Sequence, residues 1–226
     1  MSLLLCLETS SKNCSVAVTS QGLLVGVKDY FDDNYCHGEK LHVLIEELLF
    51  ELKLDLTQID GFVFSVGPGS YTGLRIGAAA IKGLAIVTQK EVILVSTLQS
   101  LAWGFLNDKK ENSPYDFLCP VLDSRKDEVY TAMYDSDLTQ HLTPFACEIN
   151  NFRFEDYLEN NKICFFGPGN YKLKTVLKHQ NVYFSDHIYP SSKYLGVLGK
   201  HLFDRKMFAD LAYFEPLYLK PFISNK

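Results

Sequence analysis

A glycine-rich turn, Gly67-Pro-Gly-Ser-Tyr-Thr-Gly73, joins two very different segments of the chain. The run before it, 62–66, is β-branched and aromatic, and the run after it is long and apolar. This order predicts a strand that leads directly into a helix. Because glycine permits sharp bends and close backbone approach, the turn has two uses. It could cradle a phosphate at the helix N-terminus, or it could pack backbone against backbone.

The spacing of the turn favours packing. A Walker loop needs Gly-Lys followed by Ser or Thr, which is absent, and a dinucleotide fingerprint needs glycine where Thr72 stands. Pro68 also lacks the backbone N–H that a phosphate loop would use. We therefore predict a tight strand-to-helix turn, with phosphate binding as the weaker alternative.

The order of predicted elements repeats once along the chain. Three strands, a helix, the strand before the glycine turn, the helix after it and a further strand come first. After a polar stretch at 107–114, a similar order begins again and reaches a second turn, Gly167-Pro-Gly169. We predict an α/β fold of two βββαβα units, 1–106 and 107–226, and leave open which unit holds the last helix. The predicted strands are 3–7, 14–19, 23–28, 62–66, 92–95, 117–122, 129–134, 141–146, 163–166 and 214–219, and the helices are 40–54, 74–89, 98–105, 154–160 and one around 194–202.

Composition indicates a globular protein of the cytoplasm. Of the 226 residues, 47% are apolar and 22% are charged, and the formal charge of −5 argues against a general nucleic-acid binder. No run approaches the eighteen or so apolar residues of a membrane helix, so we expect no membrane contact. The six cysteines contain no C-x-x-C pair. We expect neither a disulfide framework nor a metal site.

The two predicted helices beside the glycine turn carry more apolar surface than one core needs. On the first, Val43, Phe50 and Leu54 lie opposite the core-facing leucines, and only Glu47 interrupts them. On the second, small residues at four-residue spacing would let another helix come close. We predict that both helices pair with another subunit; burial inside the chain's own domain is the alternative. On the second helix, the predicted partner surface is Arg75, Gly77, Ala80, Lys82 and Leu84.

Five short motifs stand out along the chain: Leu7-Glu-Thr-Ser10, His37-Gly-Glu39, the block 67–77, Asp123-Ser-Arg-Lys-Asp-Glu-Val-Tyr130 and Leu217-Tyr-Leu-Lys220. Together they resemble the TsaB family, also called YeaZ, of the actin-like ATPase superfamily. The resemblance implies an actin-like, ribonuclease H-like fold with a degenerate nucleotide cleft. The chain departs from the family at Glu8, Gly38 and Tyr71, where Asp, Ser and Phe are usual, and it matches poorly over 135–160.

The resemblance also implies a function. Proteins of this family are non-catalytic subunits of the bacterial assembly that transfers a threonylcarbamoyl group to N6 of adenosine 37 in tRNAs reading ANN codons. A TsaD-like subunit and a TsaE-like ATPase are the implied partners, with tRNA reached through the assembly and a homodimer formed by the chain alone. ATP and the metal are expected on the partner, so this chain itself needs no cofactor.

Two rival functions compete with this one. An ATP-dependent small-molecule kinase or ATPase of the same superfamily would grip phosphates with the hairpins at 8–13 and 123–128, but neither contains glycine. A degenerate nucleotide site would consist of Glu8, Thr9, Ser10, Gly67 and Gly69. Direct tRNA capture is the second rival, and its candidate residues are Tyr171, Lys172, Lys174, Lys178 and His179.

Overall fold

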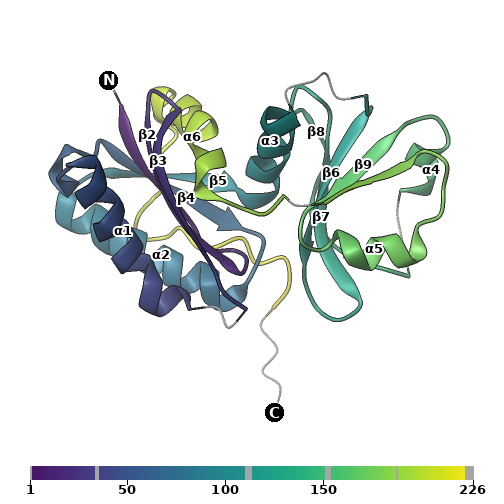
Figure 1. The fold of residues 1–226 in the computed structure, drawn as a ribbon, viewed down its shortest axis with the longest axis horizontal. Helices are drawn as coiled ribbons and strands as arrows, with labels where there is room; N and C mark the ends of the chain where they lie inside the picture. The colour runs from purple at the N-terminus through teal and green to yellow at the C-terminus, as the bar shows by residue number, and fades with distance from the viewer. Residues whose placement is uncertain (1, 34–35, 110–113, 151–153, 187, 222–226) are drawn as a thin grey trace, which may run out of the picture. The chain divides into compact units, whose positions relative to one another are not determined.

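The computed structural model describes residues 2–33, 36–109, 114–150, 154–186 and 188–221. The chain divides into two compact units (Figure 1). Unit 1 comprises Met1–Ser100 and Pro190–Leu217, and unit 2 comprises Leu101–Tyr189 and Tyr218–Lys226. The last helix therefore belongs to unit 1, although it follows all of the strands of unit 2 in the sequence.

The sheet of unit 1 has five strands in the order β3-β2-β1-β4-β5. The first three strands form an antiparallel meander, and β4 and β5 run parallel to β1. The central strands are buried on both faces, which is why the run 3–7 is apolar at every position. Their bounds are β1 Leu3–Glu8, β2 Asn13–Ser20, β3 Leu23–Phe31, β4 Gly61–Gly67 and β5 Glu91–Ser96.

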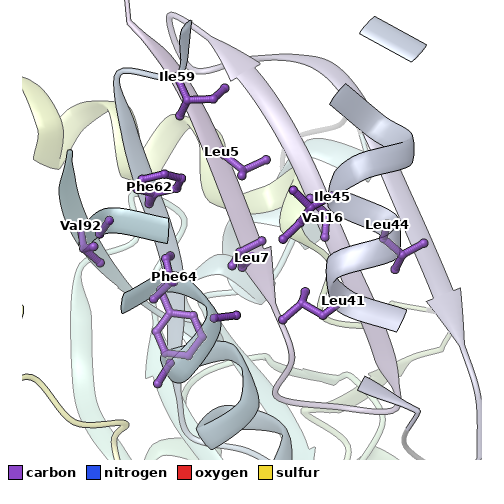
Figure 2. Packing of buried hydrophobic residues seen from close by; sticks show 14 of the residues in the cluster. Leu5, Leu7, Val16, Leu41, Leu44, Ile45, Ile59, Phe62, Phe64 and Val92 are labelled. Atoms are coloured by element: carbon purple, nitrogen blue, oxygen red, sulfur yellow. The ribbon is translucent and has the colours of Figure 1, made fainter. Parts of the chain in front are cut away.

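Helices cover both faces of this sheet. Alternate side chains such as Leu5 and Phe64 pack under α1 (His37–Leu52) and α2 (Tyr71–Thr88), in the larger core shown in Figure 2. Side chains of the opposite parity, such as Leu4 and Val63, pack with Leu195 of α6 (Leu195–Asp204). Two short 3₁₀ helices complete the unit, η1 Leu56–Gln58 and η2 Ser192–Tyr194.

The sheet of unit 2 repeats this topology. Its order, β10-β9-β6-β7-β8, again places an antiparallel meander beside two strands parallel to the first. The two βββαβα-type units expected from the sequence are thus confirmed. The elements are α3 Thr97–Lys109, which begins in unit 1, and β6 Phe117–Asp123, β7 Glu128–Tyr134, β8 Gln140–Glu148, α4 Glu155–Leu158, β9 Ile163–Phe166, α5 Asn170–Val176 and β10 Val182–Ser185.

The segment after α6 corrects one prediction. The run 214–219 was expected to be a strand, but the structure gives it no strand pairing. Instead the segment borders the core of unit 1, where Ala209 N donates to Val92 O and Leu217 N donates to Val66 O, each at 2.8 Å. Phe214 is buried against Phe64, with ring centroids 6.4 Å apart. Its apolar residues therefore reflect core packing, not sheet pairing.

Candidate functional site

The glycine turn closes directly onto the hairpin between β1 and β2. Ser70 N donates to the carbonyl oxygen of Ser10 at 2.7 Å. A Cβ built on Gly69 would lie 2.4 Å from that same oxygen, and one built on Gly73 would lie 2.1 Å from the carbonyl oxygen of Thr9. Real Cβ atoms do not come so close, so this contact needs glycine. Backbone packing is therefore how the turn is used.

Three amides at the start of α2, those of Ser70, Gly73 and Leu74, are engaged within the chain. Ser70 caps the helix, because its hydroxyl accepts from Gly73 N at 3.3 Å and its carbonyl accepts from Leu74 N at 2.9 Å. With Ser70 N bonded to the first hairpin, these donors do not point into an open anion site. The geometry gives no support to phosphate binding here.

The residues of the predicted degenerate nucleotide site do meet at this junction. Gly67 and Gly69 lie in the turn, and Glu8, Thr9 and Ser10 are buried in the hairpin. Glu8 Oε1 accepts from Ser10 N at 2.6 Å. Burial raises the pKa of the Glu8 carboxyl, and nearby hydroxyls offset this only in part. The buried Glu8 carboxylate therefore holds the hairpin together from within unit 1.

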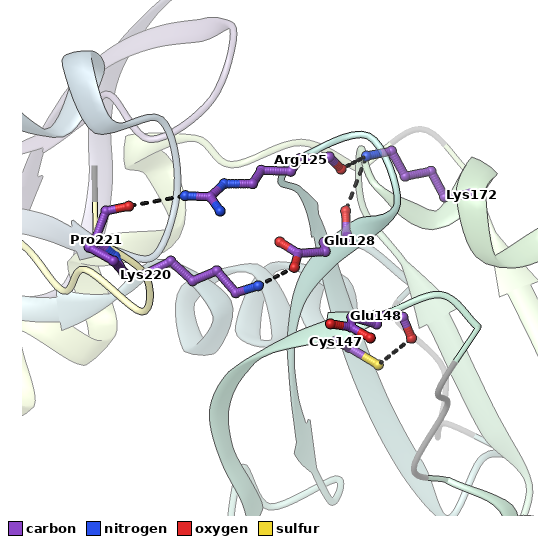
Figure 3. A network of polar contacts seen from close by, with 7 residues as sticks. All are labelled: Arg125, Glu128, Cys147, Glu148, Lys172, Lys220 and Pro221. Carbon is purple, nitrogen blue, oxygen red and sulfur yellow. Dashed lines mark hydrogen bonds and ion pairs between the residues drawn. The ribbon is translucent and has the colours of Figure 1, made fainter. Parts of the chain in front are cut away.

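The hairpin between β6 and β7 in unit 2 is filled by a lysine of the chain itself. Lys172 Nζ, from α5, donates to the carbonyl oxygens of Arg125 and Glu128 at 2.6 and 3.1 Å (Figure 3). It also lies 2.5 Å from Asp123 Oδ1, and its side chain is only 9% exposed. Carbonyl and carboxylate oxygens that converge on an ammonium group have the opposite polarity to a phosphate site.

The same hairpin holds the end of the described chain. Lys220 forms an ion pair with Glu128, and Arg125 donates to the Pro221 carbonyl oxygen at 3.0 Å (Figure 3). The 123–130 motif is therefore bonded to Lys220 of the 217–220 motif and to Pro221, which follows it. Sequence spacing had given no indication of this pairing.

Two of the four basic residues proposed for tRNA capture are paired within unit 2. Lys172 is enclosed as described, and Lys174 bonds to Asp186 at 2.5 Å. Lys178 and His179 are exposed beyond the end of α5. Two of the lysines therefore already have anionic partners, which weakens the case for a phosphate-binding face.

The predicted partner surface on α1 is exposed at its central residues. Val43 is 43% exposed and Phe50 is 83% exposed, and Glu47 lies exposed between them. Leu54 follows the end of the helix and is partly buried against the core of unit 1. Phe50 is thus a large aromatic side chain exposed to solvent.

The predicted surface on α2 needs correction. Gly77 and Ala80 are buried in unit 1, and a Cβ on Gly77 would lie 2.3 Å from Thr9 Oγ1. The small residues therefore bring α2 close to its own sheet, not to another subunit. Leu84 is also partly buried against this core.

The rest of α2 carries exposed side chains that lie outside the predicted partner surface. Ile86 is 65% exposed and Val87 is 81% exposed. Arg75 is exposed with its guanidinium over the Tyr71 ring, and Lys82 is half-buried over the Phe214 ring. Ile86 lies on the same line of the helix as Arg75 and Lys82, and this shared line could have predicted that Ile86 is exposed. We call Val43, Glu47, Phe50, Arg75, Ile86 and Val87 the outer helix face.

No metal cluster or membrane helix is found in the part of the chain that the structure describes. No three His, Cys, Asp or Glu side chains within the described ranges are grouped as metal ligands. Among the described helices, none combines the length and apolarity needed to cross a bilayer. His37 is buried, whereas His42 is exposed on α1.

Two units of this topology, each with a glycine turn at the end of its fourth strand, define an α/β protein of the actin-like ATPase class. The family model described as TsaD, tRNA N6-adenosine threonylcarbamoyltransferase, matches residues 34–213, and the chain belongs to this family. The resemblance to TsaB and YeaZ proteins expected from the motifs is confirmed by the individual relatives.

Curated relatives named tRNA threonylcarbamoyladenosine biosynthesis protein TsaB are similar over part of their length. The Haemophilus influenzae protein is 34% identical over 128 residues, covering 56% of this chain and 51% of the relative. The Escherichia coli protein is 32% identical over 137 residues, covering 59% and 55%. The matched region thus spans about half the length of these relatives. YeaZ from Pseudomonas aeruginosa has the same fold, with a TM-score of 0.82 at 24% identity over 97% of this chain and 100% of that one.

Proposed function

We propose that this chain is a non-catalytic subunit of the assembly that forms threonylcarbamoyladenosine at position 37 of tRNAs reading ANN codons. Its role is to bind and support a TsaD-like subunit, with a TsaE-like ATPase as a further partner. The TsaB relatives support the pathway, and the outer helix face supports the binding role. tRNA is reached through the assembly, and the chain forms a homodimer when the partner is missing.

The exposure of apolar side chains on the outer helix face carries this proposal. Phe50, Ile86 and Val87 are each more than three-fifths exposed, on two helices that cover the same side of one sheet. Full burial of one such side chain stabilises a complex by about 1.5–3 kcal/mol. A patch of this kind on a folded domain marks a surface that another protein covers.

The charges of the two helices indicate what covers them. The exposed side of α1 is acidic, with Glu39, Glu46, Glu47 and Glu51, whereas α2 contains Arg75 and Lys82 and no acidic residue. If a related subunit packs the same two helices against these, α1 of one subunit can lie beside α2 of the other. Acidic and basic side chains then meet at the rim, which favours the correct partner over others.

We further propose that nucleotide and metal bind the partner, not this chain. One hairpin is closed by the glycine turn, and the other is filled by the Lys172 ammonium group. A kinase or ATPase would need both hairpins to receive phosphate. The occupied hairpins therefore argue against the enzyme alternative.

Replacing Phe50 tests the proposal directly. Phe50→Asp should abolish co-elution with the TsaD-like subunit and leave the thermal unfolding temperature nearly unchanged, because Phe50 is 83% exposed. Val197→Asp, on α6 across the sheet, is the matched control and should bind normally. Unchanged binding by Phe50→Asp would show that this face is not the interface.

Calorimetry of the unmodified chain with ATP should show no submicromolar binding; such binding would contradict the placement of nucleotide on the partner.

A further inference from the structure

One imidazole joins three elements beneath the outer helix face. His37 is the first residue of α1 and is only 1% exposed. Its Nε2 lies 2.8 Å from the carbonyl oxygen of Ser11 in the first hairpin. A Cβ built on Gly73, in the first turn of α2, would lie 2.9 Å from His37 Cδ2. The ring therefore touches α2 while it ties α1 to the hairpin.

This hydrogen bond determines which nitrogen of the neutral His37 ring carries the proton. A carbonyl oxygen only accepts, so Nε2 carries the proton and donates to Ser11. Burial lowers the pKa of His37 below its ordinary value of 6.5, and the bond to Ser11 opposes this only in part. The buried ring is therefore neutral at neutral pH, and protonation places a charge inside the junction.

The charged groups around the junction are engaged with other partners. Lys12 of the hairpin pairs with Asp33, Lys40 of α1 lies over the Tyr30 ring, and Arg75 of α2 lies over the Tyr71 ring. Burial raises the pKa of Glu8 and of the Cys36 thiol, and it raises that of Cys14 to about 12. The charged groups that act on Cys36, the residue before His37, are Asp32, Glu39 and Lys40.

We propose that His37 is a positioning residue that holds α1 against α2 only while its ring is neutral, so that acid weakens association through the outer helix face. This inference rests on the proposed function, because it concerns the same surface. A histidine with a lowered pKa stabilises the closed junction fully above pH 6.5, and this contribution is lost as the pH falls below that value. The expected window of weakening is therefore from pH 6.5 downward.

The test is the dissociation constant for the TsaD-like subunit at pH 7.5, 6.5 and 5.5. Coupling to one proton weakens binding by at most about tenfold per pH unit. His37→Gln keeps an amide donor for Ser11, so it should bind like the unmodified chain at pH 7.5 and lose much of the acid weakening. His37→Leu removes the donor and should bind more weakly at every pH. His42→Gln, at an exposed site on the same helix, should keep the original pH profile and so controls for titration of the partner.

The outcomes separate this inference from the proposed function. If His37→Gln and the unmodified chain weaken equally in acid, His37 is not the sensor and the inference is wrong. If the unmodified chain does not bind the TsaD-like subunit at pH 7.5, the proposed function fails. The role of His37 in the junction is then tested by the stability of the isolated chain. In that case the free energy of unfolding should fall between pH 6.5 and 5.5, and it should fall less in His37→Gln; equal falls would overturn the inference.

Discussion

At Gly73 the missing side chain is what allows α2 to start against the first hairpin. Its nearest neighbour would be a backbone carbonyl, that of Thr9, which cannot rotate away as a side chain can. Gly83, about 2.8 turns further along the same helix, has no atom within 4 Å of an added Cβ. A close backbone contact therefore requires glycine at position 73, whereas no contact requires it at position 83.

We expect Gly73→Ala and Gly83→Ala to change stability in opposite directions. The added methyl at Gly73 collides with backbone, and overpacking of this kind costs about 1–3 kcal/mol or more. At Gly83 the methyl enters open space, and alanine favours the helix by up to about 1 kcal/mol. Chemical denaturation of the two variants measures both effects. If Gly73→Ala proves as stable as the unmodified chain, the close contact in the structure is wrong.

The sequence predicted that small residues mark a close approach, but not to what. Small residues spaced four and then three apart, at Gly73, Gly77 and Ala80, indicate a tight contact along one line of the helix. The same spacing suits a neighbouring subunit or the chain's own sheet, and only the fold distinguishes them. Phe50 was identifiable because its position opposes a complete core stripe, whereas Val87 follows no such pattern.

At the scale of elements, the hairpin between β6 and β7 depends on a residue of α5 far along the chain. Lys172 donates to the carbonyl oxygens of Arg125 and Glu128, and it pairs with Asp123. A contact between residues 44 to 49 positions apart has no local signature in one sequence. The sequence therefore suggested a solvated or tRNA-binding lysine, and the interior role was not predictable.

Lys172→Met should destabilise unit 2, whereas Lys174→Met should not. Removing the ammonium group leaves the Arg125 and Glu128 carbonyls with fewer partners, which costs about 1–3 kcal/mol. Lys174 pairs with Asp186 at the surface, where such a pair contributes less than about 1 kcal/mol. Thermal unfolding of both variants compares them. Equal effects would mean that the enclosed ammonium group has no special role.

At the scale of the whole molecule, the repeated order of strands and helices was enough to predict the fold. Alternation and turn residues set each element, and two copies of one order imply two sheets of one topology. The segment 207–217 was harder to predict, because a short apolar run fits a strand or a core-covering segment equally well. Its return to unit 1 depends on contacts with β4 and β5 that are distant in sequence.

The most direct test of the central claim is hydroxyl-radical footprinting of the chain with and without the TsaD-like subunit. This measurement reports the exposure of individual side chains and requires no mutation. Oxidation of Phe50, Ile86 and Val87 should fall several-fold in the complex, while Val197 and Met207, exposed elsewhere in unit 1, should react as before. Protection of Val197 or Met207 with Phe50 still fully reactive would contradict the account.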